Sequence, residues 1–203
     1  MDQVARRMVA LFLAAAVAAC GTGDEDAVSP EIEAAVLELG DAASTALIGT
    51  LFAQLSDAMQ AGGPVHAVDF CSTSAAELTA GVVVEQGLDI KRTSMRYRNP
   101  ANAPDQQETA ALRYYESALA ETGVLPGPWV QRAGRDEYRF YRPLVIAAPC
   151  LSCHGTADDI SPAVQGILDE RYPYDLATGY SAGDFRGVVR VSVPAARVTA
   201  SGG

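Results

Sequence analysis

Residues 129–146, WVQRAGRDEYRFYRPLVI, decide the fold of this chain. Aromatic and β-branched residues dominate both ends of the stretch, while residues 133–136 (Ala-Gly-Arg-Asp) in its middle are typical of a turn. We therefore predict a β-hairpin with strands over residues 129–132 and 137–146. The two strands of a hairpin are antiparallel, so the chain is expected to contain an antiparallel sheet.

Two further stretches have the pattern of strands. In residues 185–193, successive side chains alternate between two faces, and Val189, Val191 and Val193 share one of them. Residues 89–97 show a less regular alternation around Ile90. Residues 99–104 (Asn-Pro-Ala-Asn-Ala-Pro) must form a turn-rich loop. The hairpin thus gains two candidate partner strands, one before it and one after it.

Helical patterns surround these strands. Ser29 followed by Pro30 is typical of a helix start, and leucine or methionine recurs every fourth residue until about Met59. Residues 61–64 (Ala-Gly-Gly-Pro) break this helix, and further helices are predicted over residues 65–79, over 105–121 and from Pro162. The fold class is therefore α+β, with an antiparallel sheet flanked by helices and a long N-terminal helix.

The first twenty residues are typical of a lipoprotein signal peptide. Arg6 and Arg7 precede an apolar stretch, which ends in a lipobox-like sequence at Cys20. We expect Cys20 to be lipidated and the protein to be anchored on the periplasmic side of the outer membrane. Residues 21–29 are interpreted as a flexible tether, 30–195 as the folded domain and 196–203 as a loose tail.

The net charge and the number of cysteines limit the classes of function that this chain can have. The formal net charge of −10 argues against nucleic-acid binding, which requires a basic face. Of the four cysteines, Cys20 is assigned to the lipobox, which leaves Cys71, Cys150 and Cys153. Three cysteines in an exported protein cannot all pair as disulfides, so at least one must serve another chemistry.

The sequence Cys150-Leu151-Ser152-Cys153-His154 has the spacing of a c-type haem attachment site. Its two thiols can bond the two vinyl groups of one haem, and the adjacent imidazole can ligate the iron. Three alternatives use the same residues: a thiol-disulfide oxidoreductase based on Cys150 and Cys153, a structural disulfide, and a zinc-binding module formed by Cys71, Cys150, Cys153 and His154.

A second axial ligand has four candidates: Met59, His66, Cys71 and Met95. On a helix, Cys71 lies on the same face as Val68, Ala75 and Leu78, whereas His66 points elsewhere. Periodicity therefore favours Cys71 over His66. A buried, inert thiol is the competing interpretation of Cys71.

The sequence resembles single-haem c-type cytochromes with a PAS-like fold, long catalogued as a domain of unknown function. The matching residues are Phe70-Cys71, 92–105 with Glu108, 141–144, 150–155, 172–175, 177–180 and 183–187. The resemblance covers nearly the whole mature chain. It implies one covalent haem c, with His154 and Cys71 as the two axial ligands.

Arg96 and Arg98 flank the turn-rich loop and are candidates for contacts with the haem propionates; a surface loop fixed by its own polar side chains is the alternative. Because thiolate ligation lowers the reduction potential, we expect a non-enzymatic haem protein of low potential. It would sense redox state or a small gas, or transfer single electrons, with an unknown redox or signalling partner.

Overall fold

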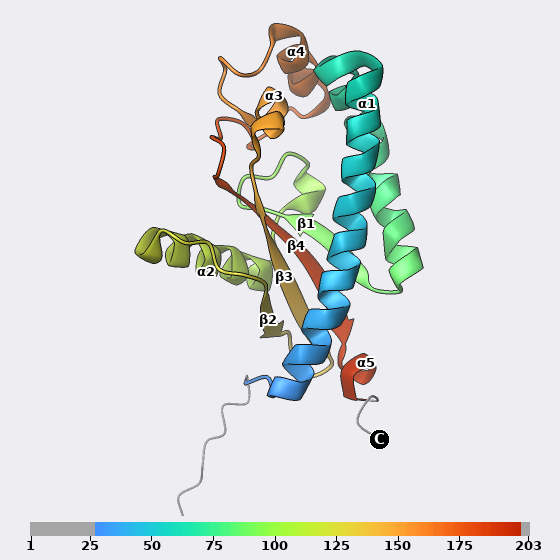
Figure 1. Ribbon diagram of the computed structural model, residues 1–203, viewed down its shortest axis with the longest axis vertical. Coiled ribbons are helices and arrows are strands. Elements are labelled where there is room, and N and C mark those ends of the chain that lie inside the picture. Colours follow the sequence, from blue (N-terminus) through green and yellow to red (C-terminus); the bar gives the residue numbers. More distant parts are fainter. Residues whose placement is uncertain (1–26, 200–203) are drawn as a thin grey trace, which may run out of the picture.

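The computed structural model describes residues 27–199 (Figure 1). The predicted signal peptide, the lipobox Cys20, most of the tether and residues 200–203 lie outside this range. The described part has an α+β architecture with a long N-terminal helix and an antiparallel sheet, which confirms the predicted fold class.

Four antiparallel strands form the sheet in the order β1-β4-β3-β2. They are β1 (Asp89–Thr93), β2 (Trp129–Arg132), β3 (Glu137–Val145) and β4 (Phe185–Pro194). The predicted hairpin is confirmed as β2 and β3, with Trp129 opposite Tyr141. β4 lies between β1 and β3, and its residues from Gly187 to Val193 are all buried.

The long helix α1 (Pro30–Gln86) covers one face of the sheet (Figure 1). Its Val36, Ala43 and Leu47 are fully buried in a core cluster with Val189 and Val191 of β4. Part of α1 is long and apolar enough to cross a membrane by composition alone. The same helix packs against the sheet through Val36, Ala43 and Leu47.

The predicted break in α1 is confirmed at Gly62 and Gly63, whose backbone angles are not helical. Gly63 has a φ of 68°, a conformation that other residues rarely adopt, and Pro64 supplies no backbone N–H. Beyond the kink the helix continues to Gln86 rather than ending at residue 79, because Val82 and Leu88 pack into the main core.

The opposite face of the sheet is covered by α2 (Gln106–Thr122). Asp105 and Glu108 form a reciprocal capping box that fixes its start. Tyr115 is fully buried against Tyr141, and its hydroxyl donates to the carbonyls of Gly127 and Tyr141, both at 3.0 Å. This pairing satisfies the only polar atom of a large buried side chain.

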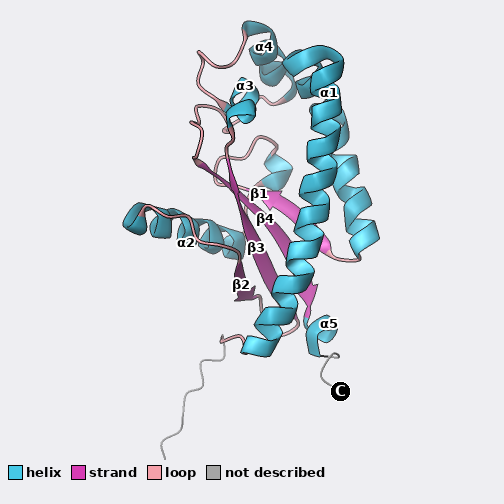
Figure 2. Cartoon of the chain, viewed as in Figure 1, coloured by secondary structure: helices cyan, strands magenta, loops and turns pink. Residues whose placement is uncertain are grey.

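Short helices and long connections gather at one end of the sheet, beside the kink of α1 (Figures 1 and 2). They include α3 (Leu151–His154), α4 (Pro162–Arg171) and the 3₁₀ turns η1 (Pro100–Asn102) and η2 (Ala148–Cys150). Val68 of α1 packs there against Ile160, Val164 and Leu168. This second, smaller core holds the cysteine motif against the main helix.

Two predicted boundaries are wrong. The strand expected over residues 89–97 ends at Thr93, because its partner β4 begins to pair only at Val188. The tail expected to be loose from residue 196 starts with a helix, α5 (Ala195–Thr199), whose Val198 packs into the main core. Burial of Val198 thus helps to order residues 195–199, for which the sequence alone predicts no regular structure.

Gly40→Ala is expected to destabilise the protein. A Cβ at Gly40 would collide with the fully buried Phe140 ring, and such overpacking costs about 1–3 kcal/mol in the free energy of unfolding. Denaturant unfolding measures the change. Gly49→Ala is the matched control on the same helix: its Cβ meets nothing within 4 Å, so it should be neutral or stabilising by up to ~1 kcal/mol. Equal effects of the two variants would contradict the packing argument.

Candidate cofactor site

The cysteine motif occupies a single helical turn. Cys150 ends η2, and α3 carries Cys153 and His154 immediately after it. Both cysteines and Cys71 are free and half-buried. Cys153 packs against the small core of α1 and α4, whereas Cys150 packs against Ile146, Ala177 and Tyr180. The two sulfurs are therefore available on neighbouring faces of one turn.

His154 is held in a defined tautomer. Its Nδ1 lies 2.7 Å from the carbonyl oxygen of Ala177, which can only accept a hydrogen bond. Nδ1 must therefore carry the proton, which leaves the lone pair of Nε2 free. Burial, together with the nearby guanidinium groups of Arg98 and Arg186, lowers the pKa of His154 to about 3. The imidazole is thus neutral at physiological pH, the form that ligates a metal.

Residues 175–180, which we call the clamp segment, wrap around α3. Tyr180 donates its N–H to the carbonyl of His154 at 3.0 Å, and Gly179 donates to that of Gly155 at 2.5 Å. Asp175 accepts the N–H of Ala177 at 2.7 Å, which fixes the turn that presents the Ala177 carbonyl. The ring of Tyr180 also packs edge-on against His154. The orientation of the imidazole therefore depends on this segment.

Arg96 and Arg98 both bind the clamp segment. Arg98 donates from Nε to the Asp175 carboxylate at 2.9 Å and from Nη2 to the Cys153 carbonyl at 2.5 Å. Arg96 donates from Nε to the Leu176 carbonyl at 3.1 Å and also bonds the carbonyl of Thr178. The two arginines thus join the loop after β1 to the histidine turn. A contact of either with a propionate stays a prediction.

Cys71 lies on the half of α1 that follows the kink, beside the motif. Burial and the nearby Cys153 thiol raise its pKa, while the guanidinium groups of Arg92 and Arg98 act in the opposite direction. Of its rivals as a ligand, His66 is exposed, and Met95, in the loop after β1, is 38 % exposed. Met59 precedes the kink. Cys71 is therefore the candidate whose surroundings include the motif.

The structure gives less support to the zinc-binding and thiol-disulfide alternatives for residues 150–154. Residues 27–199 contain no group of three or more histidine, cysteine or acidic side chains placed to hold a metal ion, so the four proposed zinc ligands do not form a cluster. Burial raises the pKa of Cys153. A redox-active dithiol instead needs a thiolate with a lowered pKa, so this environment does not favour thiol-disulfide exchange.

Two half-buried arginines near the motif were not identified as site residues from the sequence. Arg92 of β1 lies near Cys71 and Tyr172, and burial lowers its pKa. Its guanidinium makes no hydrogen bond or ion pair with another residue of the described range. Arg186, at the start of β4, is also half-buried and lies near His154 and Tyr180. The alternation of the predicted strand could have placed Arg92 on an inward face. No sequence pattern around Arg186 predicted that it lies near the motif.

The fold and the site together define an α+β domain with a single Cys-X-X-Cys-His helical turn. The family model described as Tll0287-like matches residues 7–194, and the chain belongs to this family. Its fold is similar to the crystal structure of the cyanobacterial haem protein Tll0287, with 23 % identity and a TM-score of 0.59 over 83 % of this chain and 98 % of that one. No curated protein matches the chain. The predicted resemblance is thus confirmed at the level of the family.

Proposed function

We propose that this chain is an exported, lipid-anchored c-type haem protein that senses redox state or a small gas, or transfers single electrons. Cys150 and Cys153 would bind one haem covalently, and His154 and Cys71 would be its axial ligands. When bound, the haem supplies one-electron redox chemistry. Membership of the Tll0287-like family and the haem protein of similar fold support this proposal.

The observation that carries the proposal is the state of His154. A neutral imidazole with its Nδ1 proton bonded to the Ala177 carbonyl presents a free Nε2, and two free thiols lie on the same turn. Histidines that ligate metals almost always donate their other N–H in this way. A purely structural histidine has no need of two adjacent half-buried thiols without partners.

The surrounding side chains support a charged cofactor. The guanidinium groups of Arg92, Arg98 and Arg186 all lower the pKa of His154. Arg92 has no anionic partner among the described residues. Haem propionates are carboxylates, which guanidinium groups bind well. Arg92 is thus a further candidate for a propionate contact, beside Arg96 and Arg98.

The test is expression of the full chain in a host with c-type maturation machinery. We expect a Soret band in both redox states and a denatured mass equal to that of the lipidated polypeptide plus one haem. Protein that is colourless and weighs only polypeptide and lipid would refute the proposal. A reversible midpoint with both ligands retained would favour electron transfer, whereas exchange of the cysteine for a gas would favour sensing.

Cys71→Ser is expected to change the optical spectrum and raise the reduction potential. A thiolate donates electron density to ferric iron, and serine is a poor substitute for it. Optical spectroscopy and potentiometry on the covalently loaded protein measure both effects. Thr73→Ser, two residues further and exposed, is the matched control and should leave the spectrum as it is. An unchanged spectrum in Cys71→Ser would remove Cys71 as a ligand.

A further inference from the structure

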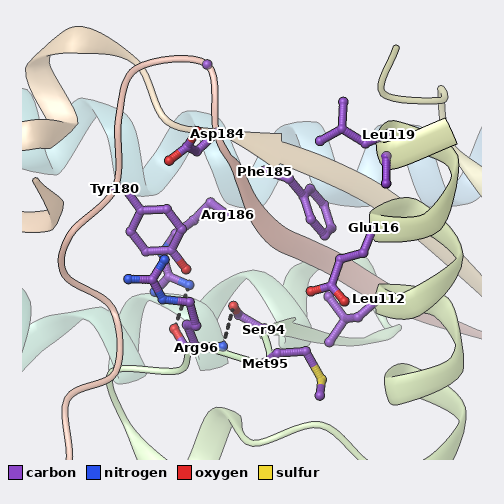
Figure 3. A pocket seen from close by; sticks show the side chains of 12 residues that line it. Ser94, Met95, Arg96, Leu112, Glu116, Leu119, Tyr180, Asp184, Phe185 and Arg186 are labelled. Atoms are coloured by element: carbon purple, nitrogen blue, oxygen red, sulfur yellow. Dashed lines mark hydrogen bonds between the residues drawn. The ribbon is translucent and has the colours of Figure 1, made fainter. Parts of the chain in front are cut away.

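A cavity of about 560 Å³ lies between α2, the loop after β1 and the start of β4 (Figure 3). None of Cys71, Cys150, Cys153 and His154 lines it. Tyr180 does line it, and the same ring packs against His154 with the centroids 6.5 Å apart. The cavity is therefore adjacent to the proposed haem site but separated from its histidine by one aromatic side chain.

One wall of the cavity is cationic. Figure 3 shows Arg96, Arg186 and Tyr180 together on one side, facing side chains of α2. The guanidinium carbons of Arg96 and Arg186 lie 3.9 Å and 5.4 Å from the centre of the Tyr180 ring. Neither arginine forms an ion pair with another residue of the described range. Two guanidinium groups without a carboxylate partner thus meet at this wall.

The buried end of this wall also offers a hydroxyl donor. Ser94 is 7 % exposed, and its oxygen accepts the N–H of Arg96 at 3.0 Å. Its own O–H has no acceptor among residues 27–199. Burial lowers the pKa of Arg186, although Tyr180 and Asp175 act in the opposite direction. An anionic group placed between these side chains would satisfy both.

The rest of the cavity limits the charge and shape of its ligand. Leu112, Leu119 and Phe185 form an apolar wall. Glu116 and Asp184 are exposed acidic residues that also line the cavity. Their charges oppose a second negative charge on the ligand, so a dianion such as a phosphate monoester is disfavoured, while one carboxylate can be held by the two arginines.

We propose that this cavity binds a small organic monocarboxylate with an apolar body. Its carboxylate would contact Arg186, Arg96 and the Ser94 hydroxyl, and its body would lie against Leu112, Leu119 and Phe185. Tyr180 would then carry the effect of occupancy to the neighbouring histidine. The inference deepens the sensing role and rests on the proposed function for that last step, whereas binding itself needs no haem.

Calorimetric titration of the full-length holoprotein tests the proposal with three probes of similar shape. Phenylacetate is the carboxylate, phenylacetamide the neutral analogue and phenethylamine the cation. We expect saturable 1:1 binding of phenylacetate and at least tenfold weaker binding of the other two, because a charge-assisted hydrogen bond is roughly twice as strong as a neutral one. Tighter binding of the amine, or no binding of any probe, would overturn the proposal.

Variants locate the site. Arg186→Gln should weaken phenylacetate binding by on the order of tenfold or more, because it removes a half-buried charged donor. Leu119→Trp should block the cavity without changing its charge, which keeps the test decisive if Arg186→Gln folds poorly. Glu116→Gln should bind phenylacetate as tightly as the wild type or more tightly. Glu121→Gln, on the same helix but outside the cavity, is its matched control and should leave affinity unchanged.

The same samples separate this inference from the proposed function. Protein that shows a Soret band but binds no probe would remove the cavity proposal alone. Colourless protein that binds phenylacetate would remove the haem proposal alone. Loss of phenylacetate affinity in Glu116→Gln would show that the acidic side chains, and not the arginines, recognise the probe, and would overturn the assignment of a carboxylate.

Discussion

With both Cys150 and Cys153 replaced by serine, we expect the denatured chain to carry no haem. Covalent attachment needs a sulfur at each vinyl group, and these two thiols are the pair that one helical turn brings together beside His154. Mass measurement under denaturing conditions, together with the absorbance that remains after extraction with acidified organic solvent, measures the loss. The wild type should keep its colour through both treatments.

Ser152→Ala is the matched control for this double variant. Ser152 lies between the two cysteines, and its hydroxyl donates to the Pro149 carbonyl at 3.1 Å, so the change alters the turn without removing a sulfur. It should retain covalent haem. Covalent haem in the double variant would place the attachment elsewhere and refute the role assigned to the motif.

Glu108→Gln is expected to lower the free energy of unfolding by about 3–5 kcal/mol, because removing one partner of a buried ion pair leaves the other charges uncompensated. The Glu108 carboxylate is fully buried between Lys91 at 2.8 Å and Arg190 at 3.1 Å. It also accepts the Asp105 N–H at 2.9 Å, which starts α2. Denaturant unfolding of the wild type and the variant measures the difference.

Glu121→Gln is the control for the loss of unfolding free energy expected in Glu108→Gln. Glu121 is exposed near the end of the same helix, where a surface substitution changes stability by less than about 0.5 kcal/mol. If Glu108→Gln also fell within that range, the buried network would contribute little, and the attachment of α2 would depend on Tyr115 and its apolar neighbours instead.

The sheet and the helices could be predicted because their signals are local. The turn at residues 133–136 sets the hairpin register, and Ser29, Asp105 and Ser161 each accept a backbone N–H at the start of a helix. The end of β1 and the helix α5 could not be predicted in this way. Both depend on contacts with β4 and the main core that come from distant parts of the chain.

The candidate site was likewise predictable only where its signals are local in the sequence. The motif at residues 150–154 and the helical face of Cys71 are visible in a short stretch of sequence. The partner of His154 is a backbone carbonyl 23 residues away, and backbone groups leave no trace in side-chain patterns. Arg98 likewise meets Asp175 across 77 residues. Composition near the motif therefore predicts its chemistry but not the groups that orient it.

The dependence of His154 on Ala177 has a consequence for the order of events during biogenesis. The two thiols and the imidazole are neighbours in any conformation of the chain, including one newly exported and still unfolded. The carbonyl that aligns the ring arrives only when residues 175–180 close over α3. We therefore expect thioether formation to tolerate an unfolded chain, and the final ligand geometry to be acquired only later, as the surrounding fold assembles.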